Sequence, residues 1–131
     1  MQQEKDYILR EIQRLTLLLT KLIGKALGLN PNEFEQETQN IESDLKTEFD
    51  LTLREISKME DSVLLERIHK LNEEHLEKLA ELISVLLNNK QTEYENRLAQ
   101  KGIVILNFLD SKSKTFSFKR IELKNTLQQW L

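Results

Sequence analysis

Cysteine is absent from this 131-residue sequence, and turn-forming residues are scarce, with 1 Pro and 3 Gly. Without cysteine the chain has no disulfide framework, thiol nucleophile or thiolate metal site. This composition fits a reducing compartment, so we expect the protein to be cytoplasmic. So few glycines and prolines leave little material for the many tight turns of a β-sandwich.

Long uninterrupted apolar runs are also missing. The most apolar window, residues 15–29, contains Lys21 and Lys25. A membrane-spanning helix needs about 20 consecutive, predominantly apolar residues. The window therefore predicts a buried helix, and we expect no membrane span.

Apolar residues instead recur every three or four positions along most of the chain. This spacing places side chains on one face of a helix, because successive residues turn by about 100°. Six such segments predict a single all-helical domain over residues 1–131, with five to six antiparallel helices stacked as tetratricopeptide-like hairpins. An up-and-down bundle is the alternative. Two stripes show the spacing clearly: Ile8, Ile12, Leu15, Leu19, Leu22 and Ala26; then Leu76, Leu79, Ile83 and Leu86.

The start of the second helix has the sharpest local signal. Asn30 can act as N-cap, Pro31 fits the first helical position, and Glu33 is a carboxylate in the first turn. The sequence predicts one helix from there that closes before Asp61. Its buried stripe is Phe34, Ile41, Leu45, Phe49, Leu53 and Ile56.

Later boundaries are predicted from polar cap residues and one glycine. The segment from Asp110 to Lys114 is expected to be a polar loop. Gly102 precedes β-branched residues that would suit a strand, but a lone strand has no partner. A helix with Gly102 at a close approach of another helix is therefore predicted. The expected caps are Asp61 or Ser62, Asn72, Thr92, and Thr115 or Ser117.

The sequence contains none of the common metal-binding or catalytic motifs. Glu66 and His69 form one Glu-x-x-His step, whereas a di-iron bundle needs two such steps and two further carboxylates. His75 has Asn72 three residues before it, so the second step is missing. No glycine-rich phosphate loop or nucleophile elbow occurs. We expect no metal, no cofactor and no enzymatic activity.

Charge is distributed unevenly. Residues 33–61 carry ten acidic against three basic residues, whereas residues 110–131 carry five basic against two acidic. Phe116 and Phe118 lie among the basic residues, and such a pattern can hold a nucleic-acid strand. The chain is acidic overall, with a pI near 5.5. We therefore expect the two phenylalanines to anchor the last helix in the core, with no nucleic-acid partner.

A resemblance covers most of the chain. Residues 5–12 read Lys-Asp-Tyr-Ile-Leu-Arg-Glu-Ile, and residues 79–82, Tyr94 and residues 115–120 follow in a similar order. This pattern resembles a group of small, uncharacterised bacterial helical proteins that begin with Asp-Tyr-Ile-x-Arg-x-Ile. The resemblance implies degenerate tetratricopeptide-like helix pairs and a bacterial source. It implies no activity.

Helical architecture without catalytic motifs predicts a non-enzymatic protein–protein interaction or scaffold module with an unidentified protein partner. A helical bundle that binds a small molecule or lipid is the alternative. The last helix is more apolar than one buried stripe requires, so a homodimer with Trp130 near its interface centre is predicted. The candidate interface residues are Phe118, Ile121, Leu127, Trp130 and Leu131.

Overall fold

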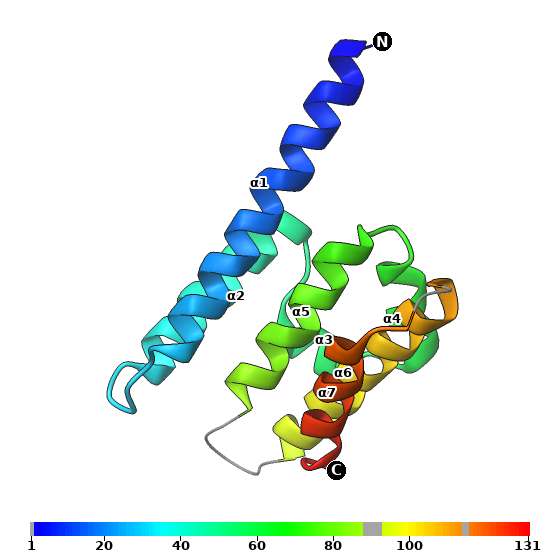
Figure 1. The fold of residues 1–131 in the computed structure, drawn as a ribbon. Helices are drawn as coiled ribbons and strands as arrows, with labels where there is room; N and C mark the ends of the chain where they lie inside the picture. The colour runs from blue at the N-terminus through cyan, green and yellow to red at the C-terminus, as the bar shows by residue number, and fades with distance from the viewer. Residues whose placement is uncertain (1, 88–92, 114–115) are drawn as a thin grey trace.

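The computed structural model describes residues 2–87, 93–113 and 116–131, and within these ranges it contains seven α-helices and no strand (Figure 1). The all-helical class is therefore confirmed. The helices are α1 (Gln2–Leu27), α2 (Phe34–Phe49), α3 (Leu53–Lys58), α4 (Asp61–Ile68), α5 (Glu73–Leu86), α6 (Glu93–Lys112) and α7 (Phe118–Gln128).

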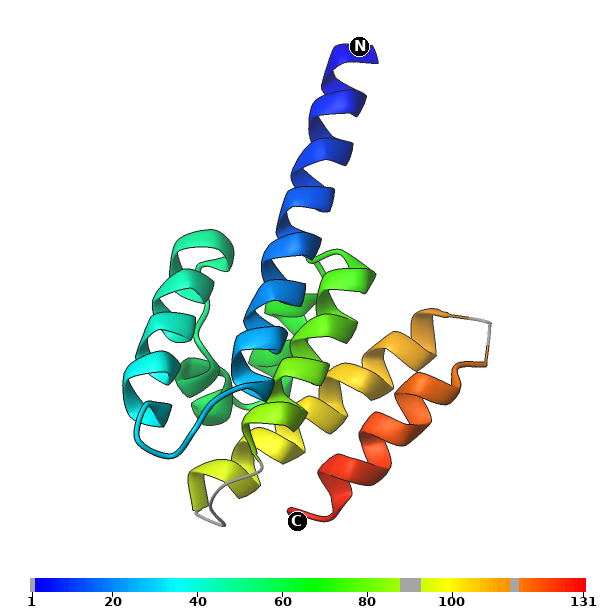
Figure 2. The same cartoon turned by 60° about the vertical axis from the view of Figure 1, so that its left-hand side comes forward.

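The helices pack around α5 and α6. The main partner of α1 is α5, which runs beside it in the same direction, while α2 packs on α1 less extensively (Figures 1 and 2). On its other side α5 packs on α6, which also contacts α3, α4 and α7. A bundle and a hairpin stack are both consistent with this packing. The tetratricopeptide-like order stays a prediction.

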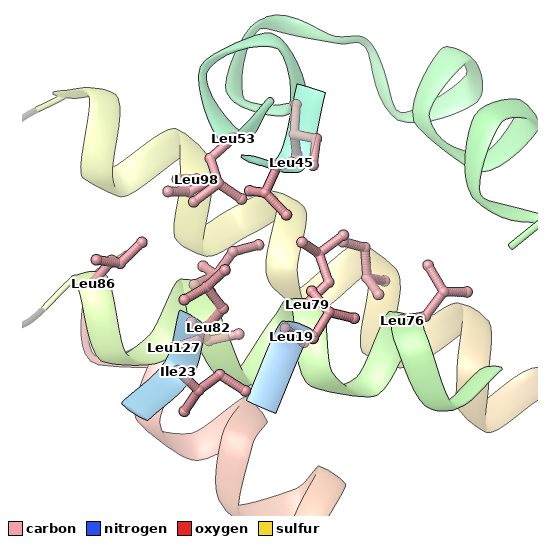
Figure 3. Close-up of a cluster of buried hydrophobic side chains, with 14 of the residues drawn as sticks. Leu19, Ile23, Leu45, Leu53, Leu76, Leu79, Leu82, Leu86, Leu98 and Leu127 are labelled. Carbon is pink, nitrogen blue, oxygen red and sulfur yellow. The ribbon is translucent and has the colours of Figure 1, made fainter. Parts of the chain in front are cut away.

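A single hydrophobic cluster draws side chains from all seven of these helices (Figure 3). The apolar stripes predicted for α1 and α5 both contribute to this cluster. The stripe of α5 is buried along its whole length, whereas the stripe of α1 is buried only from Leu19 onward. Full burial of one such side chain stabilises the fold by about 1.5–3 kcal/mol. The labelled members are Leu19, Ile23, Leu45, Leu53, Leu76, Leu79, Leu82, Leu86, Leu98 and Leu127.

Gly102 lies in an unbroken helix, as predicted, at a close contact between α6 and α7. A Cβ placed on Gly102 would lie 2.8 Å from Leu127 Cδ1 and 3.5 Å from Ile83 Cγ2. These distances confirm the close approach of another helix. Because glycine has no Cβ, α7 can lie closer to α6 here than beside any other residue.

The second helix differs from its prediction at both ends. Asn30 Oδ1 accepts a hydrogen bond from the Glu33 backbone N–H at 3.2 Å, but this closes a turn, and α2 begins only at Phe34. The helix ends at Phe49, because Asp50 adopts a left-handed conformation with φ of 55°. The predicted continuous helix is therefore two, α2 and α3.

A capping box begins α3 after this break. The Thr52 hydroxyl accepts a hydrogen bond from the Glu55 N–H at 3.1 Å, in the pattern Thr-x-x-Glu. The Glu42 carboxylate from α2 also accepts bonds from the N–H groups of Leu53 and Arg54, at 2.7 and 3.0 Å. Together these acceptors satisfy the free N–H groups that a helix start leaves.

The other predicted boundaries are mostly observed. Asn72 caps α5 through the Glu74 N–H, and Ser117 caps α7 through the Arg120 N–H. The predicted cap at Asp61 or Ser62 is wrong, because α4 already includes Asp61 and has Glu60 at its N-cap position. The predicted loop at Asp110 is wrong, because α6 continues to Lys112. Thr92, Lys114 and Thr115 lie outside the described residues.

Candidate protein-interaction surface

The first turns of α1 extend beyond the body of the molecule (Figures 1 and 2). The helix has 26 residues and is therefore about 39 Å long. Its apolar stripe passes from solvent into the core along this length. Ile8 is 55% exposed, Ile12 and Leu15 are half-buried, and Leu19 is 1% exposed. We call residues 5–11 the projecting segment.

Large apolar side chains are concentrated on the projecting segment. Tyr7 and Leu9, which point about 100° to either side of Ile8 around the helix, are both more than half exposed. A cluster of exposed apolar side chains is typical of an interaction site, whereas single ones are common on any surface. This segment is therefore the strongest candidate surface on the part of the chain that the structure describes.

A groove of about 610 Å³ lies at the foot of the projecting segment. It is formed by α1, the end of α2 and the residues that lead into α5. Its apolar lining consists of Ile12, Leu15, Phe49 and Leu71, with His75. Its polar lining consists of Thr47, Glu48, Asp50, Lys70 and Asn72.

His75 fixes the start of α5 to α1 at this groove. Its side chain is buried, and its Nε2–H donates to the Ile12 carbonyl oxygen at 2.9 Å, with the Thr16 hydroxyl oxygen at 3.1 Å. The ring meets Phe49 edge-on. Sequence reasoning missed this role. The signal was available, because His75 lies four residues before Leu79 and therefore on the buried face of the same helix.

Arg14 links α1 to the end of α2 beside the groove. Its guanidinium donates to Glu11 in its own helix and to Glu48 of α2 at 2.7 Å. These hydrogen bonds hold the pKa values of Glu11 and Glu48 below their usual range. All three side chains are partly exposed, so solvent screening leaves the pairs little effect on stability. Their effect is to orient charge around the groove.

The five interface residues predicted on the last helix differ in how exposed they are in the structure. Leu127 is 0% exposed and packs over Gly102, so this part of the prediction is corrected: the fold itself uses that side chain. Trp130 is half-buried against the core. Phe118 and Ile121 are exposed one turn apart near the start of α7, and Leu131 is exposed beyond its other end.

Phe116 and Phe118 are exposed, so the prediction that they anchor α7 in the core is wrong. Their rings meet edge-to-face, with centroids 4.8 Å apart. The buried face of α7 is set by Arg120 and Leu127, which are seven residues apart. Phe118 precedes Arg120 by two residues and therefore points about 200° away from that face.

Basic residues of α7 are paired with acids of neighbouring helices. Asp110 of α6 accepts hydrogen bonds from Arg120 at 2.6 Å and from Lys124. Lys119 pairs with Glu81 of α5 at 3.1 Å. The Lys124 ammonium, and then Arg120, hold the pKa of Asp110 below its usual range. These acids belong to α5 and α6 and not to the acidic segment of residues 33–61.

A second groove, of about 530 Å³, lies between α2, α3, α5 and α6. Its apolar lining includes Phe34, Leu86 and Tyr94, and its polar lining includes Glu35 and Arg54. Arg54 stacks over the Tyr94 ring, 5.6 Å from its centroid. Burial, and next the negative charge of Glu42, raise the pKa of Tyr94 to about 12.

Among the described residues, no group of three or more His, Asp or Glu side chains could hold a metal ion. In the single Glu-x-x-His step, the His69 ring Nδ1–H donates to the backbone carbonyl of Glu66 at 2.5 Å. Within the same residues, no helix is long and apolar enough to cross a membrane.

Comparisons with protein-family models, with curated proteins and with solved structures find no significant match to this chain.

Proposed function

We propose that this chain is a non-enzymatic protein–protein interaction or scaffold module that binds its partner through the projecting segment of α1. One observation supports this most directly: the apolar stripe that α1 buries against α5 continues onto the projecting segment, where Ile8 is 55% exposed and the helix extends beyond the body of the molecule (Figure 1). An apolar helix face of this kind is suited to pack against another helix.

The spacing of the stripe supports a helical partner. Its members are four, three, four, three and four residues apart, which is the a/d spacing of helix pairs that pack by knobs into holes. Inside the molecule this seam packs on α5. On the projecting segment the same seam is available to a helix from outside.

Photo-crosslinking in cells of the source organism tests the proposal. Benzoyl-phenylalanine in place of Ile8 should form a covalent adduct heavier than the 15.5 kDa chain. The same amino acid in place of Leu17 is the matched control. Leu17 is 70% exposed on α1 but lies nine residues from Ile8, and therefore about 180° away from it around the helix. Equal yields at both positions, or no adduct at Ile8, would refute the proposal.

A small-molecule or lipid-binding function is the second candidate, favoured by the groove around Tyr94. Its volume of about 530 Å³ falls within the range of known ligand pockets, about 300–1,000 Å³. Titration with a fluorescent fatty acid tests it. Tyr94→Ala should weaken binding if the ligand occupies this groove, whereas Tyr7→Ala should not. Unchanged binding in Tyr94→Ala would exclude the groove.

A further inference from the structure

We infer that the groove around Tyr94 binds a small organic cation, a positively charged molecule with an apolar body. The inference rests on the second candidate function above and deepens it by naming the class of ligand. It does not depend on which protein binds the projecting segment.

The apolar lining of the groove suits the body of such a molecule. Phe34 of α2 and Tyr94 of α6 contribute aromatic rings, and both side chains are half-buried. Buried leucines from three helices add to this lining: Leu53, Leu86 and Leu98. A concave, mostly apolar site with a few polar groups is typical of small-molecule binding. The groove can therefore remove the apolar part of a ligand from water.

The charged side chains of the groove are mostly acidic. Among the described residues, Glu35 and Glu42 of α2 and Glu95 of α6 line it, against one basic residue, Arg54. Glu95 is only 9% exposed, so its carboxyl group is largely sheltered from water. A cleft lined by one sign of charge concentrates the electric field and attracts ligands of the opposite sign. The groove therefore favours a cation over an anion.

The fold does not neutralise the carboxylates of Glu35 and Glu42. In the ranges that the structure describes, no lysine or arginine forms an ion pair with either of them. The hydrogen bonds that Glu42 accepts come from the backbone N–H groups of Leu53 and Arg54, which carry no net charge. Both negative charges are therefore available to a ligand.

Tyr94 indicates the sign of the potential within the groove. After burial, the charge of Glu42 has the largest effect on the pKa of Tyr94, and it raises this pKa by more than Arg54 lowers it. Glu95 raises the pKa of Tyr94 further. The Arg54 guanidinium already lies over the Tyr94 ring, 5.6 Å from its centroid, and such a ring can attract the cation of a ligand in the same way. Even with Arg54 in place, the potential at Tyr94 is negative.

Equilibrium dialysis of the purified full chain against three dyes that share one ring system tests the inference. At mildly alkaline pH, 9-aminoacridine is a cation, acridine is neutral and acridine-9-carboxylate is an anion. We expect the cation to bind with the lowest Kd and the anion with the highest. Added sodium chloride should weaken the binding of the cation and leave that of acridine unchanged. Equal affinities for the three dyes, or no binding of 9-aminoacridine at about 200 µM protein, would overturn the inference.

Charge variants identify the site. Glu35→Gln should raise the Kd of 9-aminoacridine about fivefold, the effect of one unit charge at about 4 Å in water. Arg54→Gln should lower this Kd by a similar factor, because it removes the competing cation. Glu122→Gln is the matched control on exposed α7 surface, outside the groove lining, and should change nothing. Circular dichroism checks that each variant keeps its helices.

Neutral acridine separates charge from shape. Its Kd should be the same in the wild type, Glu35→Gln and Arg54→Gln. If Arg54→Gln weakens 9-aminoacridine and acridine alike, Arg54 acts through the shape of the groove and the inference is wrong.

The inference and the second candidate function fail in different ways. If Tyr94→Ala weakens acridine and the fluorescent fatty acid as much as 9-aminoacridine, the groove binds small molecules without preferring cations. The second candidate function then stands and the inference is overturned. Tetralysine that binds more tightly than 9-aminoacridine would overturn the inference in favour of a basic peptide. Crosslinking from the projecting segment is unaffected by any of these outcomes.

Discussion

Gly102 determines how closely α7 packs on α6. Alanine at this position would gain about 1 kcal/mol of helix propensity. Its Cβ would, however, lie 2.8 Å from Leu127 Cδ1, a buried atom that must move, and overpacking of this kind costs about 1–3 kcal/mol. We expect Gly102→Ala to lower the free energy of unfolding by about 1 kcal/mol, measured by urea denaturation.

A double-mutant cycle separates these two effects. In a Leu127→Ala background the clashing atom is gone, so Gly102→Ala should become stabilising. If Gly102→Ala is equally destabilising in both backgrounds, contact with Leu127 is not the cause.

Tyr94 provides a second prediction for a single residue. Its pKa is raised to about 12 by burial, so the folded state binds the phenolic proton more tightly than the unfolded state, where the pKa is about 10. The stabilising effect is therefore complete below pH 10 and is lost as the pH rises from 10 to about 12. Tyr94→Phe should reduce this alkaline loss of stability. Absorbance titration of tyrosinate should show one tyrosine in the wild type that ionises late and is absent from the variant.

At the scale of the element, the start of α3 depends on one hydroxyl. Thr52→Ala removes the acceptor for the Glu55 N–H and should destabilise the protein by about 0.5–2 kcal/mol. Thr47→Ala is the matched control, because the Thr47 hydroxyl bonds only within α2, to the Ser43 carbonyl, on an exposed surface. Urea denaturation of both variants measures the difference. Equal effects would show that the cap contributes nothing specific.

The separation of α2 from α3 illustrates what the sequence could and could not predict. Apolar spacing continues through Phe49, Leu53 and Ile56 as if one helix were present, and all three side chains do pack inward. The break comes from Asp50, a residue that tolerates the left-handed conformation but does not demand it. The sequence does contain the Thr52-x-x-Glu55 pattern of a capping box, but the continuous apolar spacing predicts one helix across it.

The candidate surface was harder to predict for a different reason. The stripe of α1 has the same spacing at Ile8 as at Leu22, so the sequence alone does not distinguish the exposed end from the buried one. Exposure is decided by where α5 begins, at Glu73, and by its position beside α1. This is a property of tertiary packing. The burial of Leu127 has a similar origin, since it depends on Gly102 in another helix.

At the scale of the whole molecule, the projecting segment determines the shape. A compact chain of 131 residues is expected to have a radius of gyration of about 14 Å. Small-angle scattering of the full chain, extrapolated to zero protein concentration, should give a larger value. Deletion of residues 2–9 should bring the radius close to the compact value and leave the melting temperature unchanged, because Tyr7, Ile8 and Leu9 are largely exposed. A markedly lower melting temperature would show that these residues stabilise the body.

The pairing of α1 with α5 also has a consequence for the order of events during synthesis. The contact between Ile12 and His75 joins residues 63 positions apart. At roughly 5–20 residues per second, a ribosome needs about 3 to 13 s to add the intervening chain. For that interval the nascent α1 carries its whole apolar stripe without the helix that later covers most of it. During synthesis α1 therefore exposes an apolar face to which a chaperone can bind.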